Sequence, residues 1–146
     1  GYSSLEDPKI NKELKNVLSL KSYVATIKKV SKGDYVGYSR GFIAQGDLNI
    51  GIIPIGYADG YQRRYSGLGY VLIRGMKCNI IGHICMDMIF CDVSALTSPK
   101  VGEEVVLIGD EKNQSITAKD YAKACKTIPY EILTSITERV PRVFNH

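Results

Sequence analysis

The stretch Gly51–Arg64, GIIPIGYADGYQRR, joins an apolar run to a glycine-flanked turn, and the rest of the chain is organised around it. Its isoleucines predict a short buried strand, in which Pro54 is tolerated only at an edge or a bulge. The strand stops at Gly56–Gly60 (GYADG). Two glycines around an aspartate predict a tight turn there, in backbone conformations that other residues resist.

Phenol and guanidinium groups gather at this end of the predicted strand. They belong to Tyr57, Tyr61, Arg63, Arg64 and Tyr65. Such a cluster suits an anionic ligand, because both kinds of side chain donate hydrogen bonds and the arginines carry positive charge. A surface turn with solvated arginines explains the same residues, and this stretch alone favours that simpler interpretation.

Two further motifs flank this stretch. Gly37–Phe42 (GYSRGF) precedes it and Gly82–Asp87 (GHICMD) follows it. Together the three motifs resemble the C-terminal domain of alanine racemase, the pyridoxal-phosphate enzyme that interconverts L-alanine and the peptidoglycan precursor D-alanine. The resemblance runs from Val17 to Phe144, and the closing string Glu138–Phe144 (ERVPRVF) fits it too. The serine racemases of vancomycin resistance share this domain and remain an alternative.

Many short apolar segments, separated by turns about every eight to twelve residues, predict a barrel or a sandwich. The resemblance implies a mainly β fold, an alanine-racemase C-terminal-like β-barrel domain with short helices near the C-terminus. Thr117 with Asp120 three residues later predicts the start of one helix, and Pro129 suits the first turn of another. The expected strands span residues 17–30, 35–44, 48–56, 69–73, 77–84, 88–93 and 104–108.

The composition divides the chain in two. Residues 1–16 are polar and lysine-rich, and we interpret them as a linker or the tail of a preceding domain, in which Asp7-Pro8 suits the start of a short helix. Residues 17–146 are assigned to the racemase C-terminal β domain. Because the chain starts at Gly1 without an initiator methionine, we expect it to be a fragment of a longer protein.

Charge and composition argue against several kinds of binding site. A net charge of +4 on 146 residues is too small and too scattered to indicate nucleic-acid binding. The four cysteines form no CxxC pair and no zinc-ligand spacing, and only two histidines are present. We therefore expect no metal site and no Ser-His-Asp triad.

The cysteines also bear on the compartment. Each of them has apolar neighbours, which predicts buried free thiols in a reducing environment. No apolar run is long enough to span a membrane, and no signal-peptide pattern is present. We expect a cytoplasmic protein, although a full-length protein of the vancomycin-resistance type would allow a membrane anchor.

Tyr38 is the candidate catalytic residue. Racemisation needs a base that removes the Cα proton from one face and an acid that returns a proton to the other, and pyridoxal phosphate stabilises the carbanion between them. A phenol, whose unperturbed pKa is about 10, is a poor base near neutral pH unless cations or hydrogen bonds favour its phenolate. In alanine racemases a tyrosine at this position is the second base, opposite the cofactor lysine. Without the resemblance, a packed strand tyrosine is the simpler interpretation of Tyr38.

The resemblance also assigns residues to a substrate pocket. Met86, with its neighbours Cys85 and Asp87, matches the segment that lines this pocket, where the methionine backbone N–H is expected to meet the substrate carboxylate. Tyr57 and Arg63 match positions at the entrance, and an arginine there steers a small carboxylate inward. Without the resemblance, the Ile-Cys-Met string is ordinary core, and the arginine is equally a surface side chain with a buried stem.

Three more positions complete the expected site. His83 stands where most alanine racemases have an arginine, so a largely neutral imidazole weakens the positive charge of the entrance. Tyr130 matches the tyrosine that reaches the cofactor phosphate and narrows the pocket beside the substrate methyl group. Ile128 is expected to line the same corridor. Without the resemblance, Tyr130 is simply a tyrosine in the first turn of a helix.

The cofactor lysine of the family has no counterpart here. It belongs to an N-terminal (β/α)8 barrel, and no lysine of this chain stands in such a motif, so the chain resembles half an enzyme. The resemblance implies three partners: that barrel, a second copy in a head-to-tail homodimer, and a small amino-acid substrate. In such a dimer Tyr38 and Met86 enter the site of the other subunit, while Tyr130 serves its own.

Two alternatives from other classes stay open. The chain is also consistent with a non-catalytic β-barrel binding module that uses the tyrosine and arginine cluster of residues 57–65 for an anionic ligand or a protein. The related domain of fold-type III amino-acid decarboxylases is disfavoured, because Ile84–Asp87 (ICMD) stands where a Gly-Pro-x-Cys-Asp string is expected. Alanine and serine cannot be separated as substrates at this stage.

Overall fold

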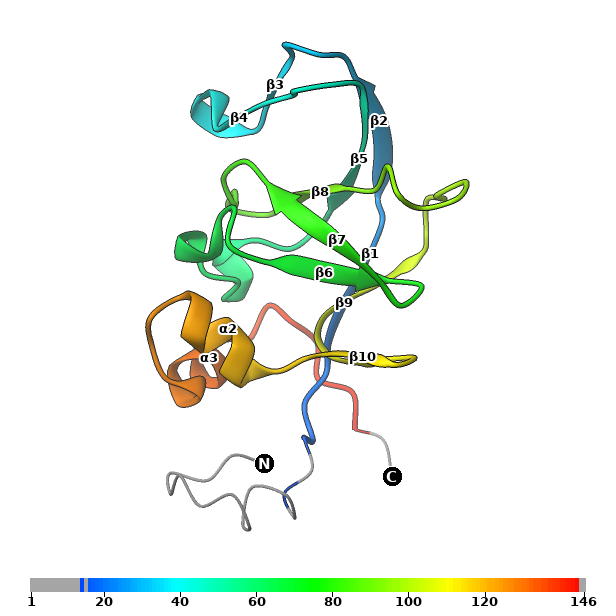
Figure 1. Cartoon of the computed structure of the whole chain (residues 1–146). Helices are drawn as coiled ribbons and strands as arrows, with labels where there is room; N and C mark the ends of the chain where they lie inside the picture. The colour runs from blue at the N-terminus through cyan, green and yellow to red at the C-terminus, as the bar shows by residue number, and fades with distance from the viewer. Residues whose placement is uncertain (1–13, 15, 145–146) are drawn as a thin grey trace.

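The computed structural model describes residue 14 and residues 16–144 (Figure 1). The predicted linker over residues 1–16, including the helix start at Asp7-Pro8, lies almost entirely outside the described residues. The last two residues of the predicted domain over 17–146 lie outside them as well.

The described chain is built mainly of short antiparallel strands. Eight of them form one sheet in the order β1-β9-β6-β7-β8-β5-β2, with β10 paired to β9, while β3 and β4 form a separate small hairpin. The strands are β1 (Leu20–Tyr23), β2 (Thr26–Val30), β3 (Tyr35–Val36), β4 (Phe42–Ile43), β5 (Leu48–Ile53), β6 (Tyr70–Ile73), β7 (Met76–Ile81), β8 (Ile89–Asp92), β9 (Glu104–Glu111) and β10 (Gln114–Ile116).

The large sheet curls because the two ends of its path are consecutive in the chain. Only Val24 and Ala25 separate β1 from β2. The Val24 N–H donates to the Glu103 carbonyl, and the Ala25 N–H donates to the Ile52 carbonyl, both at 2.9 Å. One bent segment therefore pairs with opposite ends of the sheet, as Figure 1 shows. The predicted mainly β, barrel-like fold with short helices near the C-terminus is confirmed.

The curl encloses a main hydrophobic core, and a smaller cluster covers the outer side of two strands. Val71 and Ile73 of β6 pack into the main core. Between them, Leu72 points the other way and packs with Val106 of β9 and Ile116 of β10. Both faces of β6 are therefore buried, which explains its continuous apolar run.

Two short helices follow the sheet. In α2 (Ala118–Ala124) the Asp120 N–H donates to Thr117 Oγ1 at 3.1 Å, and the Thr117 N–H donates to Asp120 Oδ2 at 3.0 Å. This reciprocal pair confirms the predicted capping box. Pro129 stands at the start of α3 (Pro129–Ser135), as predicted. Within the part of the chain that the structure describes, no helix has the length and apolar character of a membrane span.

Three local predictions differ from the structure. Residues 17–30 are not one strand, because β1 begins at Leu20 and two residues separate it from β2. Residues 35–44 are not one strand, because the 3-10 turn η1 (Tyr38–Arg40) separates β3 from β4. Gly37, Ser39 and Arg40 have φ of 77°, 55° and 54°, and the left-handed region is incompatible with an extended strand. Strand β9 also continues past Ile108 through Gly109 and pairs with β10, which was not predicted.

Candidate functional site

The structure gathers three motifs that are far apart in the sequence around one cleft of about 480 Å³. Tyr38 comes from η1, Tyr57 from the 3-10 turn η2 (Tyr57–Asp59) and Arg63 from the 3-10 turn η3 (Arg63–Tyr65). The loop between β7 and β8 adds the rest of the lining, which consists of Ile84, Cys85, Met86, Asp87 and Met88. Most of the predicted site residues therefore meet in one place.

The turn at Gly56–Gly60 is bonded directly to that loop. The Tyr57 N–H donates to the Cys85 carbonyl at 3.1 Å, and the Ala58 N–H donates to the Met86 carbonyl at 3.0 Å. Only glycine fits at position 56, since a Cβ there would lie 2.3 Å from both of these carbonyl oxygens. The turn and the loop therefore hold Tyr57 and Met86 in a fixed relation.

Tyr38 projects from a backbone in an uncommon conformation. Ser39 and Arg40 both have positive φ although neither is glycine, and such strain concentrates at functional sites. The Tyr38 side chain is 76% exposed. The predicted alternative of a packed strand tyrosine is therefore wrong, because the phenol is neither in a strand nor buried.

His83 lies beneath the Tyr38 turn. A Cβ on Gly41 would approach His83 Cδ2 to 2.6 Å, so the imidazole ring lies against the Gly41 backbone. His83 lines a neighbouring depression together with Gly41, Phe42 and Ser66, and it does not line the cleft. Its contact supports the turn that carries Tyr38.

Met86 presents an unused backbone donor beside the cleft. Its carbonyl accepts a hydrogen bond from Ala58, whereas its N–H has no hydrogen-bond partner among residues 16–144. The residue is 54% exposed. Arg63 supplies the positive charge among the described residues of the lining, and Asp87 supplies the negative one. The cleft therefore combines two phenols, a guanidinium and a free amide, all of which can donate hydrogen bonds to an anion.

Tyr130 and Ile128 stand apart from this cleft. Ile128 precedes α3 and Tyr130 lies in its first turn, and both side chains are partly exposed. Neither residue lines the cleft.

The tyrosines that follow the turn have a structural role that the sequence did not indicate. Tyr61 and Tyr65 are buried, and their ring centroids lie 5.2 and 4.2 Å from that of Tyr121 and 5.6 Å from each other. Burial raises the pKa of Tyr65 to about 12 and raises the pKa of Tyr61 and Tyr121 well above the usual value. Tyr61 and Tyr65 lie inside the core, where a ligand cannot reach them, so the predicted anion-binding cluster over residues 57–65 is wrong for two of its three tyrosines.

Comparisons with known proteins show the family and the fold of this chain. The family model described as "Alanine racemase, C-terminal domain" matches residues 17–144. The chain belongs to this family. The chain is 43% identical over 143 residues to alanine racemase of Clostridium perfringens, a match that covers 98% of this chain. It is 42% identical over 136 residues to alanine racemase of Halothermothrix orenii, covering 93% of this chain and 36% of that relative.

Solved structures give the same result. Alanine racemase of Bacillus anthracis with bound L-Ala-P superposes with a TM-score of 0.88 at 35% identity, over 97% of this chain and 37% of that chain. Alanine racemase of Bartonella henselae with covalently bound pyridoxal phosphate superposes with a TM-score of 0.83 at 36% identity, over 89% of this chain and 35% of that chain. The chain spans 37% of the length of the Clostridium perfringens relative.

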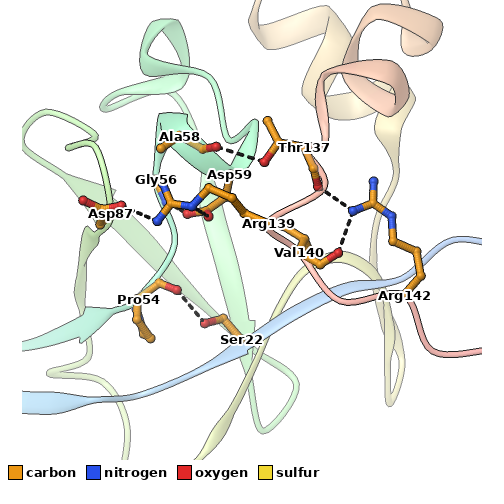
Figure 2. Close-up of polar contacts among 10 residues, drawn as sticks. All are labelled: Ser22, Pro54, Gly56, Ala58, Asp59, Asp87, Thr137, Arg139, Val140 and Arg142. Carbon is orange, nitrogen blue, oxygen red and sulfur yellow. Dashed lines mark hydrogen bonds and ion pairs between the residues drawn. The ribbon is translucent and has the colours of Figure 1, made fainter.

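Sequence reasoning missed four residues in or beside the cleft. One of them, Ile84, is part of the lining. Met88 lines the cleft. Arg139 reaches the Asp87 carboxylate at 2.7 Å and the Asp59 carboxylate at 3.6 Å (Figure 2), and both carboxylates raise the pKa of its guanidinium. Asp59 belongs to the GYADG motif and Arg139 to the ERVPRVF motif. The sequence therefore singled out both motifs, but nothing in it indicated that these two residues form an ion pair.

The three buried cysteines of the racemase domain match the predicted free thiols, and the fourth differs. Cys78, Cys91 and Cys125 are buried and free. Cys85 is free and only partly buried, because it stands at the cleft.

Proposed function

We propose that this racemase domain is part of a pyridoxal-phosphate enzyme that interconverts L- and D-alanine. One observation carries the proposal, namely the convergence of Tyr38, Tyr57, Arg63 and the Cys85–Asp87 segment on a single cleft. The relatives at 42–43% identity are named alanine racemase, which favours alanine over serine as the substrate. Serine racemisation in vancomycin resistance is the weaker candidate, since no residue of the cleft points to it.

Tyr38 is the proposed acid–base group of the domain. Its phenol is largely exposed at the mouth of the cleft, so it can reach a Cα atom held by another domain. Arg63 lines the same cleft and favours a negative charge on a nearby phenolate. A tyrosine on one face of Cα requires a second base on the other, and no lysine lines the cleft within the described residues.

The substrate carboxylate is the proposed ligand of Met86. The free Met86 N–H supports this role, because a backbone amide at the edge of a cleft is a ready donor to an anion. Arg63 and Tyr57 add a charge and a hydroxyl on the same side, with Cys85 and Asp87 forming the wall. In this proposal His83 contributes indirectly, by supporting the turn that carries Tyr38. Ile128 lines the corridor through which the substrate reaches the site.

The cofactor would meet this chain at Tyr130, whose phenol is proposed to bind the phosphate group. When bound, pyridoxal phosphate supplies the electron sink that makes a Cα proton acidic enough to remove. No lysine lines the cleft within the described chain, so its residues suit the substrate side of such a site and do not form a covalent anchor. The anchor is proposed to lie in an N-terminal (β/α)8 barrel.

We propose that the cleft is covered only when another domain and a second subunit pack against it. Tyr38, Met86, Ile128 and Tyr130 are apolar or aromatic side chains that remain exposed, which supports burial by the barrel domain and by a second copy of the protein. We propose a homodimer in which the cleft of one subunit completes the site of the other. Its cytoplasmic location stays a prediction.

The experiment that tests this function is a racemisation assay on the full-length enzyme with Tyr38→Phe. We expect a loss of about 10²–10⁴-fold in activity, because removal of an acid–base group costs that much. Tyr23→Phe is the matched control, since Tyr23 is an exposed tyrosine of β1 outside the cleft. Near-normal turnover of Tyr38→Phe would remove Tyr38 from the mechanism, and a wild-type enzyme that does not racemise alanine would refute the proposed reaction.

A further inference from the structure

Arg139 lies between two carboxylates that belong to two motifs of the site. Its Nη2 donates to Asp87 Oδ1 at 2.7 Å, and its Nε lies 3.6 Å from Asp59 Oδ1. The other oxygen of Asp59 already accepts the Gly56 N–H at 2.9 Å. Arg139 therefore connects the turn at Gly56–Gly60 with the loop that carries Met86, as Figure 2 shows.

The segment that carries Arg139 is itself held against the same turn. The Thr137 N–H donates to the Asp59 carbonyl at 3.1 Å, and Thr137 Oγ1 donates to the Ala58 carbonyl at 2.9 Å. Arg142 then donates to the carbonyls of Thr137 and Val140 (Figure 2). It also donates to the Ile136 carbonyl at 2.8 Å. The backbone at Arg139 is therefore held in place, although the Arg139 side chain is half exposed.

The charge of Asp87 makes this contact relevant to substrate binding. Asp87 lines the cleft next to Met86, whereas Arg139 does not line it. An uncompensated carboxylate at the rim would repel the carboxylate of an amino acid. Because exposed ion pairs contribute little to folding, the effect of this pair is expected in the cleft more than in global stability. With Asp87 balanced by Arg139, the charge of Arg63 dominates the lining.

We propose that Arg139 is a positioning residue for the substrate carboxylate. It holds the Met86–Asp87 rim in place and cancels the negative charge that Asp87 brings to the cleft. The proposal rests on the proposed function, because it assumes that an amino acid enters this cleft. It adds a role for the ERVPRVF motif, whose first arginine, Arg139, does not line the cleft.

The first test measures kcat and KM for alanine in the full-length enzyme carrying Arg139→Gln. We expect KM to rise about tenfold while kcat changes less than about threefold, because an interaction made equally in the ground and transition states acts on KM. Arg74→Gln is the matched control. Arg74 is also a partly exposed arginine, paired with Glu103 at 3.5 Å and with the Thr97 carbonyl at 2.9 Å, and it lies outside the cleft. Its KM should stay at the wild-type value.

The second test adds Asp87→Asn to the Arg139→Gln enzyme. Removing the unbalanced carboxylate should bring KM back to within about threefold of the wild-type value, because the repulsion is then absent. A merely structural role for Arg139 predicts no such rescue, since Asp87→Asn restores no contact. A KM of Arg139→Gln that equals the wild-type value, or a double variant no better than the single one, would overturn the proposal.

Hydrogen–deuterium exchange on the same full-length proteins supplies a readout besides activity. Arg139→Gln should speed exchange at the Tyr57 and Ala58 amides, whose hydrogen bonds join the turn and the loop, and Arg74→Gln should not. Unchanged exchange in Arg139→Gln would overturn the positioning role whatever the kinetics. A wild-type enzyme that fails to racemise alanine would instead refute the proposed function and, with it, the role toward a substrate carboxylate.

Discussion

Tyr57 and Tyr61 lie four residues apart in one motif and have opposite surroundings. Tyr57 is 42% exposed and lines the cleft, whereas Tyr61 is 1% exposed and packs in the core. Gly60 separates them with φ of 97°, and a Cβ there would lie 2.1 Å from the Ser135 carbonyl. This left-handed residue reverses the chain so that the next side chain points inward. A single glycine therefore decides which tyrosine is available for chemistry.

Tyr130 carries the prediction about substrate choice. A tyrosine beside the substrate side chain leaves room for a methyl group, while serine adds a hydroxyl that must find a partner when buried. We expect the full-length enzyme to prefer alanine and Tyr130→Asn to shift the kcat/KM ratio towards serine. The shift should be about 1–3 kcal/mol, because a pocket rejects an added hydroxyl weakly.

The ratio for Tyr130→Asn should be measured at saturating pyridoxal phosphate, because this residue is also proposed to bind the phosphate. Tyr35→Asn is a suitable control, since Tyr35 is an exposed tyrosine on β3 that lies outside the cleft. A wild-type enzyme that uses serine as well as alanine would show that Tyr130 is not the gate.

At the scale of elements, the turn at Gly56–Gly60 is the part to which the others are attached. Its amides bond to the loop between β7 and β8, and its carbonyls accept hydrogen bonds from Ser135 at the end of α3 and from Thr137 just after it. The elements that it joins come from distant parts of the chain. The position of the cleft lining therefore depends on the close backbone approach that the two glycines allow.

Gly56→Ala should destabilise the protein by about 1–3 kcal/mol, the usual cost of overpacking a closely packed site. Its added Cβ would meet the Cys85 and Met86 carbonyl oxygens, which belong to backbone and cannot move aside cheaply. Urea unfolding measures the change. Gly46→Ala is the matched control, because a Cβ there meets nothing within 4 Å and Gly46 does not have positive φ. Equal midpoints for the two variants would contradict this account of the turn.

At the scale of the whole molecule, the described chain has a continuous core but an open site. The curled sheet buries a main apolar cluster that extends to Tyr121 and Ile132 of the two helices. In contrast, the cleft exposes Tyr38 and Met86 and contains no lysine within the described lining. The core contacts within the described chain are therefore sufficient to support the fold, whereas the proposed racemisation needs a cofactor lysine from outside the cleft.

The isolated 146-residue chain should fold but not racemise alanine. Circular dichroism with a cooperative thermal transition tests folding, because the core described above is largely self-contained. A racemisation assay with added pyridoxal phosphate tests activity. Racemisation by the chain alone would contradict the proposal that the cofactor lysine lies in another domain.

Stability should fall as pH rises from about 9 to about 11. Burial raises the pKa of the Cys78 thiol to about 11, above the value of about 8.5 for an exposed cysteine. The unfolded chain then loses this proton at a lower pH than the folded chain does. The stabilisation that the protonated Cys78 thiol gives the folded state is therefore complete below pH ~8.5 and is lost as pH rises through the folded pKa. Urea midpoints at pH 8, 9, 10 and 11 measure it.

Cys78→Ala cannot lose a thiol proton, so its midpoint should fall less steeply over the same range. Its absolute stability will be lower, because the substitution leaves a small cavity in the core. The slope against pH is therefore the quantity to compare. Identical slopes for the variant and the wild type would show that Cys78 does not contribute.

The features that could be predicted from the sequence are those that depend on neighbours within a few residues. Apolar runs and turn residues located most of the strands, the Thr117–Asp120 capping box located α2, and Pro129 located the start of α3. The motif strings also indicated the family and most of the cleft lining, since they are local signatures. These predictions succeeded because backbone propensities, caps and alternation act over a single turn or strand.

Contacts between segments far apart in the sequence could not be predicted and became visible only in the folded chain. Arg139 and Asp87 are 52 residues apart, and Thr137 and Ala58 are 79 apart, so no local pattern announces either contact. The burial of Tyr61, the place of His83 under the Tyr38 turn and the added strand β10 also follow from what packs nearby. An identical side chain is core or site depending on its neighbours in space, and the hydrophobic and electrostatic terms that decide between them are set by the folded arrangement.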